Sequence, residues 1–400
     1  MNSVEIFALS DSYIAPTYNR FPLALVKGAG VKVWDADGNE YLDCLAGIAV
    51  CNLGHCHPRV SAAISEQARQ LMHVSNLYHI EPQAQLAEIL CEFSFAEKVF
   101  FCNSGAEANE AAIKLARRYG DAVLGAGRTR IITMQDSFHG RTMATLTATG
   151  QQKVKTGYQP LLEGFDCVPF NNIDAVAAAI TDKTCAVLVE PVQGEGGVIV
   201  PDTDYLERLR QLCDEHKILL ILDEVQTGIG RTGKFFAYQH SNVAPDILTS
   251  AKALGNGFPI GAMLASDQVL THFGHGSHAS TFGGNPLASA ASLATIRTLR
   301  DEKIIDKVGE KGAFLVAGLK KLQTEFPEII GAIRGLGLMV GMDIKVPVGD
   351  IVKACLEKYL LVGSAGANTL RLTPPLVIEK AEIETLLRIL TEVFSDVRKA

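Results

Sequence analysis

Two charged residues near the middle of the chain stand where short, largely apolar runs end. Residues 218–222 are apolar and lead into Asp223 and Glu224, and a second run, 246–249, is followed closely by Lys252. Because ligands of open α/β sheets bind at the carboxyl ends of the strands, we expect Asp223 and Lys252 to face a ligand. A lysine that is partly removed from water has a lowered amine pKa and can form a Schiff base. In isolation, Lys252 could equally be a surface lysine that extends its charged end into solvent.

A third feature, the stretch 103–107, could bind an anion. It reads NSGAE and lies between the apolar run 98–102 and a helical pattern, so it would place free backbone N–H groups at a helix N-terminus. The alternative is a simple strand-to-helix turn that Ser104 caps. Asp223 suits pairing with the nitrogen of a pyridinium ring, which keeps such a cofactor an electron sink. A phosphate site, an aspartate and Lys252 in this order therefore predict pyridoxal phosphate (PLP) as the cofactor.

The glycines that follow Asp223 offer a competing interpretation as a nucleotide site. Residues 228–233 read GIGRTG and match the GxGxxG pattern, but a dinucleotide site needs a helix next, and KFFAYQHSNVAPD has weak helical periodicity. The same glycines nearly form a P-loop, yet Phe235 occupies the position of the Mg²⁺-binding hydroxyl. We therefore expect this loop to serve another purpose than nucleotide binding.

Short apolar runs alternate with helical patterns through the middle of the chain, which indicates a mostly parallel, doubly wound α/β sheet. The expected strands are 98–102, 130–134, 185–190, 218–223 and 246–250, and the expected helices are 106–119, 174–180 and 203–216. A hairpin is expected over residues 31–42, around the turn DADGN. We predict an N-terminal segment of a small domain at 1–50, a large domain at 51–290 and the rest of the small α+β domain at 291–400.

Composition narrows the class of protein further. The chain has 400 residues, 48% of them hydrophobic, and a net charge of −7, which argues against nucleic acid as a partner. No apolar run approaches the roughly 20 residues of a membrane span, and the N-terminal segment lacks the pattern of a secretory signal. The nine cysteines are scattered as in reduced proteins, so a cytoplasmic location is expected. Cys51, His55, Cys56 and His57 lack the usual spacing of zinc ligands, and no metal is expected.

With these features assembled, the chain resembles the class III aminotransferases of the PLP-dependent fold-type I group. The resemblance runs nearly end to end through motifs in fixed order: DADGNEYLD, GHCHP, FCNSGAEANEAAIKLAR, FHGRT, EPVQGEGG, LDEVQTGIGRTG, SAKALGNGFPIGA, STFGGNP and LRLTPPL. The nearest resemblance is to the acetylornithine aminotransferases and their succinylornithine relatives. It implies a large domain around a doubly wound sheet, a smaller domain built from both chain ends, PLP, and a homodimer with shared active sites.

The resemblance also implies roles for individual residues. Lys252 would form the aldimine with the cofactor and serve as general base and acid, and Asp223 would pair with the pyridine nitrogen. The other residues expected to bind the cofactor are Ser104, Gly105 and Ala106 at the phosphate, Phe138 and Val225 on the two ring faces, Gln226 at the ring hydroxyl, and Thr281, which would reach the phosphate of the partner subunit's cofactor. Substrate contacts are expected from Arg141, Ser280, Glu195 and Arg371. Ala106 stands where the family commonly has threonine, and Asn256 where it often has glycine.

The expected reaction transfers the δ-amine of N2-acetyl-L-ornithine to 2-oxoglutarate in ping-pong fashion. It yields N-acetylglutamate 5-semialdehyde and L-glutamate, as in arginine biosynthesis. Ornithine δ-aminotransferases use a tyrosine in the segment before GHCHP to select free ornithine, and residues 45–51 contain none. Succinylornithine, succinyldiaminopimelate, 4-aminobutyrate and ornithine remain alternative donors, with a role in lysine synthesis also open. A PLP-dependent aminomutase or decarboxylase and a non-catalytic nucleotide-binding protein are the alternatives from other classes.

The two substrates of this reaction differ in where their carboxylates lie. The acceptor carries a carboxylate beside the reacting carbon, and the ω-amine donor does not. A guanidinium binds a carboxylate in a bidentate way, so Arg371 would hold that carboxylate and Arg141 the distant one of either substrate. Glu195 would pair with Arg371 and hide its charge while the amine donor is bound.

Overall fold

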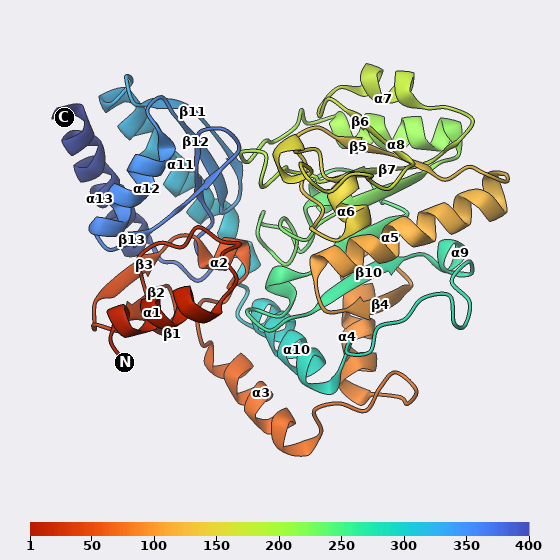
Figure 1. Cartoon of the computed structure of the whole chain (residues 1–400), viewed down its shortest axis with the longest axis horizontal. Helices are drawn as coiled ribbons and strands as arrows, with labels where there is room; N and C mark the ends of the chain where they lie inside the picture. Colours follow the sequence, from red (N-terminus) through yellow and green to blue (C-terminus); the bar gives the residue numbers. More distant parts are fainter. Residues whose placement is uncertain (400) are drawn as a thin grey trace.

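The computed structural model describes residues 1–399, and Ala400, the last residue of the predicted C-terminal part, lies outside them. The chain folds into a larger part and a smaller part, and both termini lie in the smaller one, at the left of Figure 1. The predicted division at residues 50 and 290 stays a prediction, but the pairing of strands shows directly which ends of the chain meet.

A mixed sheet forms the centre of the larger part, and it confirms the predicted α/β class. Its strand order is β4 (Lys98–Cys102), β10 (Gly261–Ala265), β9 (Ile247–Ser250), β8 (Leu219–Asp223), β7 (Thr184–Val189), β5 (Arg130–Met134) and β6 (Phe165–Val168). β10 is antiparallel to both of its neighbours, and the other pairs are parallel. β6 and β10 were not predicted, since β10 reads GAMLA and has little of the β-branched character typical of strands.

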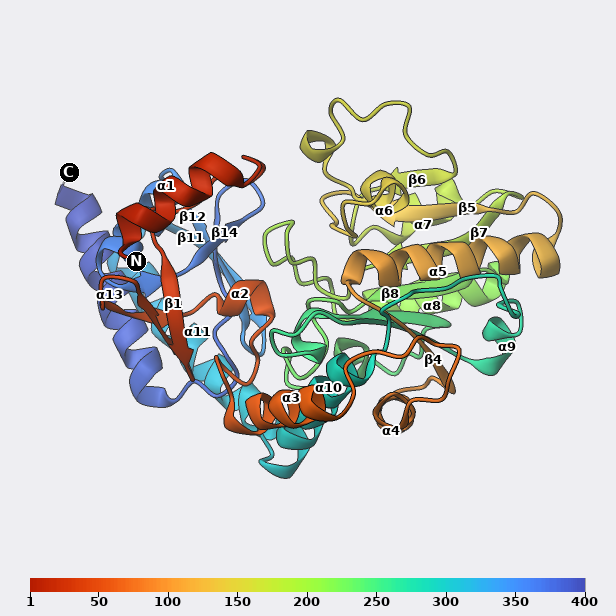
Figure 2. The same cartoon turned by 60° about the horizontal axis from the view of Figure 1, so that its bottom comes forward.

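Alternate residues of these strands face opposite sides of the sheet, and each side has its own core. Leu219 and Ile221 pack with the buried face of α5 (Gly105–Tyr119), which runs across one side of the sheet in Figure 2. Leu220 and Leu222 belong to the core on the other side, where Leu209 of α8 (Tyr205–His216) also packs. The sheet is covered by helices on both faces, so the strand ends remain as the places where polar side chains can meet a ligand.

The smaller part joins the two ends of the chain through its sheets. β1 (Leu25–Ala29), β2 (Lys32–Asp35) and β3 (Glu40–Asp43) form an antiparallel ribbon, and β13 (Leu360–Leu361) pairs in parallel with β3. A second sheet has the order β11 (Ile330–Leu336), β12 (Met339–Ile344), β15 (Thr369–Leu372) and β14 (Gly363–Ala365). The helices of this part are α11 (Val308–Glu325), α12 (Val348–Glu357) and α13 (Lys380–Lys399).

The remaining helices of the described chain are α1 (Ser3–Tyr13), α2 (Ala46–Ala49), α3 (Pro58–Gln70), α4 (Glu81–Glu92), α6 (Met143–Ala148), α7 (Ile173–Ala179), α9 (Asp267–Leu270) and α10 (Pro286–Asp301). They differ in burial: α6 and α10, for example, are largely buried. The long helical region expected after Pro286 is divided between α10 and α11, with a short 3₁₀ turn at Ile305–Lys307 between them. Among the described residues, no helix has the length and apolar character that crossing a membrane requires.

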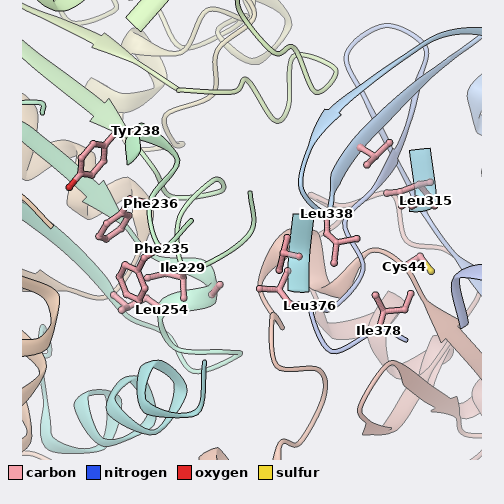
Figure 3. Close-up of a cluster of buried hydrophobic side chains, with 14 of the residues drawn as sticks. Cys44, Ile229, Phe235, Phe236, Tyr238, Leu254, Leu315, Leu338, Leu376 and Ile378 are labelled. Carbon is pink, nitrogen blue, oxygen red and sulfur yellow. The ribbon is translucent and has the colours of Figure 1, made fainter. Parts of the chain in front are cut away.

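One apolar core continues from the larger part into the smaller one. Figure 3 shows Ile229 and Leu254 on the side of the large sheet, and Leu338 and Leu376 on the side of the small one, all within a single cluster of buried side chains. The glycine-rich loop over residues 228–233 lies at this junction: a Cβ on Gly230 would meet Ile305 at 2.8 Å. The predicted loop therefore packs between the two parts. The next element of the described chain is a short 3₁₀ turn, Ala237–His240, in place of the α-helix that a dinucleotide site would require.

Candidate active site

A cavity of about 420 Å³ opens at the carboxyl ends of β8 and β9, within the size range of small-molecule sites. Nine of the residues expected at the site line it: Ser104, Gly105, Ala106, Phe138, Arg141, Asp223, Val225, Gln226 and Lys252. Glu195 and Arg371 adjoin it through Gln226, whose side chain lies 3.4 Å from each of theirs. Ser280 and Thr281 do not line this cavity.

Asp223 is the last residue of β8 and is held in one orientation by three donors. Its Oδ2 accepts hydrogen bonds from Asn109 Nδ2 at 2.7 Å and from the His139 ring at 2.8 Å, and its Oδ1 accepts one from the Val225 amide at 3.0 Å. Only 3% of the residue is exposed, at the cavity wall. A buried carboxylate held this way keeps a fixed negative charge directed at the cavity, which suits a cationic ring nitrogen.

Lys252 follows β9 and projects into the same cavity from a strained backbone. Its φ of +47° lies in the left-handed region, which is uncommon for a side chain of this kind and concentrates at functional sites. Burial lowers the pKa of its amine below 10.5, although the negative charge of Glu195 acts in the opposite direction. A lysine with a lowered pKa has more of its amine in the neutral form that attacks carbonyl carbon.

The N-terminus of α5 forms the other wall of the cavity. Ser104 is the N-cap, and its hydroxyl accepts a hydrogen bond from the Glu107 amide at 3.2 Å, while the remaining amides of the first turn have no acceptor within the helix. A Cβ on Gly105 would lie 2.7 Å from a methyl carbon of Val225, so only glycine fits there. These amides and the helix dipole can hold a phosphate at the cavity, as the sequence predicts.

The remaining lining residues fit the flat ring of the expected cofactor. Phe138 and Val225 both line the cavity and offer an aromatic and an apolar surface, and Gln226 adds an amide beside them. The ring of Phe138 also has the Arg141 guanidinium carbon 5.7 Å from its centre. One cavity of suitable size is thus lined by backbone amides that can bind a phosphate, by two apolar side chains that can cover a ring, by a carboxylate and by an amine. The residues present therefore fit PLP.

Arg371 on β15 and Glu195 form an ion pair next to this cavity. Burial raises the pKa of the Glu195 carboxyl, but the Arg371 guanidinium outweighs it and holds that pKa below its usual range. The Arg371 side chain is 3% exposed, and its Nε has no hydrogen-bond partner within residues 1–399. A guanidinium with an N–H left unpaired has bonding capacity for a second carboxylate.

Ser280 and Thr281, which neither line the cavity nor adjoin it through Gln226, lie on a partly exposed segment. The Ser280 hydroxyl is 3.2 Å from Asn103 Nδ2, and Asn103 does line the cavity, whereas Thr281 is exposed. Phe282, the next residue, is 58% exposed and contacts the ring of His73. The role of Thr281 toward the cofactor of a second subunit stays a prediction.

Asn109, His139 and Glu190 are polar residues at the site for which the sequence predicts no contact with a ligand. Asn109 and His139 orient Asp223, and Glu190 lines the cavity at the end of β7. Glu190 accepts hydrogen bonds from the amides of Phe138 at 3.0 Å and Gly194 at 3.3 Å, and burial raises its pKa to about 7. Its position after an apolar strand repeats the signal of Asp223, so the pattern that found Asp223 could have found Glu190.

Within the described residues, no cluster of three or more potential metal ligands occurs.

Comparison with known proteins relates this geometry to enzymes. The family model described as aminotransferase class-III matches residues 13–394. The acetylornithine aminotransferase of Caldanaerobacter subterraneus subsp. tengcongensis is 51% identical over 387 residues, which cover 96% of this chain and 98% of the relative. A structure of ornithine aminotransferase from Toxoplasma gondii, with PLP at partial occupancy in its active site, superposes with a TM-score of 0.96 at 34% identity, covering 100% and 95% of the two chains. The acetylornithine aminotransferase of Elizabethkingia anophelis superposes with a TM-score of 0.89 at 33% identity, over 99% and 100%.

Proposed function

The chain belongs to the class-III aminotransferases, and we propose that it transfers the δ-amine of N2-acetyl-L-ornithine to 2-oxoglutarate with PLP as cofactor. One observation carries the reaction type above all others. A lysine with a lowered amine pKa and an acid fixed by three donors face the same cavity, and a carboxylate–arginine pair adjoins it. The first two groups suit amine chemistry, and the pair suits alternation between substrates with and without an α-carboxylate.

PLP bound in this cavity would supply the electron sink that stabilises a carbanion next to the substrate nitrogen. Ser104, Gly105 and Ala106 would hold its phosphate at the N-terminus of α5. Phe138 and Val225 would confine the ring between them, with Gln226 at its hydroxyl. These assignments rest on the positions of the residues around the cavity and on the family.

Asp223 would hold a proton on the ring nitrogen, because its carboxylate is fixed and faces the cavity. Lys252 would bind the cofactor covalently and, once displaced by the substrate amine, would move a proton at the carbon that bears that amine. A general base works best when its pKa lies near the operating pH, and burial shifts the pKa of Lys252 in that direction.

The arginines would distinguish the two substrates. Arg141 lines the cavity and would bind the carboxylate remote from the reacting carbon. Ser280, which is hydrogen-bonded to Asn103 of the cavity wall, would contact the substrate as well. Arg371 would bind the carboxylate beside the reacting carbon of 2-oxoglutarate, and Glu195 would occupy Arg371 while the ω-amine donor is bound. The segment 45–51 offers Val50 to the cavity and has no tyrosine, which supports a donor whose α-nitrogen is blocked and uncharged.

A homodimer with shared active sites accounts for the exposed apolar segment near Thr281. Leu77 and Tyr78 are 85% and 68% exposed, and Asn76 Nδ2 binds the carbonyl oxygens of Ser280 and Gly283 at 3.1 and 2.9 Å. Exposed apolar patches of this kind mark interaction sites, and a second copy would bring its Thr281 toward the phosphate amides. All nine cysteines are unpaired in the described part of the chain, which agrees with the proposed cytoplasmic location. A place in arginine biosynthesis follows from the proposed donor, acetylornithine.

A half-reaction followed by the absorbance of the cofactor tests the reaction type. Acetylornithine alone should bleach the visible band of the PLP-loaded protein, and 2-oxoglutarate should then restore it. The Lys252→Ala variant should lack that band and should release the cofactor on dialysis. If acetylornithine leaves the band unchanged while amines of another kind bleach it and 2-oxoglutarate then restores it, the proposed donor is wrong.

A further inference from the structure

The turn that carries Glu195 is held by the smaller part of the molecule, although it belongs to the connection between β7 and α8. The Gly366 amide, at the turn between β14 and β15, donates to the Glu195 carbonyl oxygen at 2.8 Å. A Cβ on Gly366 would lie 2.7 Å from the Gly196 oxygen, which shows how closely the two turns approach. Glu195 is thus attached by its backbone to the same sheet that carries its side-chain partner, Arg371.

Arg334 on β11 attaches the turn through its guanidinium group. Its Nη2 and Nε donate to the Gly197 carbonyl oxygen at 2.6 and 3.0 Å, and its Nε also lies 3.1 Å from the Val198 oxygen. Asp343 holds the other edge of the guanidinium in a bidentate pair at 2.7 and 2.8 Å, and Thr369 accepts from it at 3.0 Å. A guanidinium used in this way is a rigid fork, and lysine cannot reproduce it.

The strand register places the two arginines on either side of this turn. Arg334 pairs with Gly341 across β11 and β12, and Gly341 pairs with Arg371 across β12 and β15, so all three residues form one row on one face of the sheet. The middle position is a glycine, and a Cβ there would lie 2.9 Å from the Val198 side chain and 3.1 Å from the Gly197 oxygen. The turn therefore lies across the row at Gly341, held by the backbone at Arg334 and by the Glu195 side chain at Arg371.

We propose that Arg334 is a positioning residue for substrate discrimination: it fixes the turn that carries Glu195 so that the Glu195 carboxylate stays directed at Arg371. This inference rests on the proposed exchange of Glu195 and substrate carboxylate at Arg371. Because the turn is hydrogen-bonded to the sheet that carries Arg371, the backbones of the two residues keep their relative position, and the pair opens by rotation of the Glu195 side chain alone. Loss of Arg334 frees the turn, weakens the shield over Arg371, and lets α-amino acids bind more readily as donors.

The test compares second-order rate constants of the donor half-reaction for acetylornithine and for glutamate, measured by the cofactor absorbance. Arg334→Gln should lower the ratio of the acetylornithine rate constant to the glutamate rate constant by about threefold to tenfold. This is the range expected for residues that act through coupling. In a Glu195→Ala background, which lowers the ratio by itself, Arg334→Gln should have no further effect. Asp343→Asn, which removes the charge and one of the two accepting oxygens that orient Arg334, should change the ratio in the same direction.

Controls separate this effect from general destabilisation. Arg398→Gln removes another arginine of the smaller part, one that binds Glu328 at 2.6 Å away from the cavity, and should leave the ratio unchanged. Arg334→Lys keeps the positive charge and replaces Arg334→Gln in the test if that variant does not fold. It should also lower the ratio, because lysine lacks the planar guanidinium that binds the turn and Asp343 at once. If Glu195→Ala lowers the ratio of the acetylornithine to the glutamate rate constant but Arg334→Gln or Arg334→Lys leaves it at the wild-type value, Arg334 has no positioning role. That result leaves the proposed function intact. A wild-type protein that does not react with acetylornithine refutes the proposed function instead.

Discussion

His139 Nδ1 and Asp223 Oδ2 lie 2.8 Å apart, and the two side chains are 0% and 3% exposed. Asn109 reaches the same oxygen at 2.7 Å, so Oδ2 is fully engaged, while Oδ1 keeps only the Val225 amide. The carboxylate therefore presents one oxygen with spare acceptor capacity, next to the cavity. His139 and Asn109 act on the site through Asp223, and their effects should follow from how well they hold that orientation.

Replacement of Asp223 by alanine should lower kcat by about 10³-fold or more, which corresponds to ~4 kcal/mol, because the ring nitrogen loses its counter-charge. Lys252 remains, so the variant should still bind PLP covalently and show its visible band. His139→Gln should lower kcat far less, by about tenfold, since Asn109 still binds Oδ2. Stopped-flow measurement of the donor half-reaction reports both values. If the Asp223→Ala variant retains the wild-type kcat, Asp223 has no role in the mechanism.

The pH at which cofactor-free protein captures PLP should reveal the lowered pKa of Lys252. Only the neutral amine reacts, and burial favours that form, so the capture rate should level off at a pH below that expected for an amine with the ordinary pKa of 10.5. Glu195 stabilises the ammonium form, so Glu195→Gln should shift the profile to still lower pH. The measurement is the initial rate of the rise in visible absorbance across a pH series. A profile whose inflection lies near 10.5 would show that Lys252 is solvated like a surface lysine.

The hydrogen bond between His55 and Asp43 should make the protein less stable at alkaline pH. This hydrogen bond, 2.7 Å long, raises the pKa of His55 from 6.5 to about 10, with a further contribution from Cys51. A folded-state pKa above the unfolded one means that the contribution is complete below 6.5 and disappears as the pH rises through about 10. The free energy of unfolding should thus fall by about 1–2 kcal/mol more in the wild type than in His55→Asn between those pH values. Urea unfolding at both ends of the range measures it, and parallel pH curves for the two proteins would contradict the pairing.

The exposed segment that includes Leu77 and Tyr78 should be needed for a dimer and for tight cofactor binding. Analytical ultracentrifugation of the PLP-loaded protein should show a dimer, and replacing both residues by glutamate should yield monomers that lose PLP faster on dialysis. Val123 is also exposed, by 49%, and follows the C-terminal end of α5, whose other end is at the cavity, so Val123→Glu is a matched control that should remain dimeric. Thr281→Ala should preserve the dimer and weaken only PLP binding. A wild-type monomer with full activity would exclude shared active sites.

The main strands were predictable because their apolar runs end abruptly in charged or polar residues, as at Asp223. The antiparallel strand β10 was not, since its small residues carry little strand signal and its direction depends on pairing with β4 and β9. Asn109 was missed because a single polar residue on the sheet-facing side of α5 becomes meaningful only when Asp223 is placed opposite it. Arg334 gave no signal either: its role depends on the register of β11, β12 and β15, which involves residues distant along the chain.

The central proposal is that the cavity accepts an ω-amine whose α-nitrogen is acetylated and passes its nitrogen to 2-oxoglutarate. The most direct measurement is kcat/KM for glutamate formation from 2-oxoglutarate with acetylornithine and with free ornithine as donors, in one assay. Succinylornithine, succinyldiaminopimelate and 4-aminobutyrate complete the series. The proposal predicts that acetylornithine exceeds ornithine by about tenfold or more, since a site built for an uncharged substituent rejects a free ammonium group. Equal values for acetylornithine and ornithine, or no glutamate from acetylornithine, would contradict it.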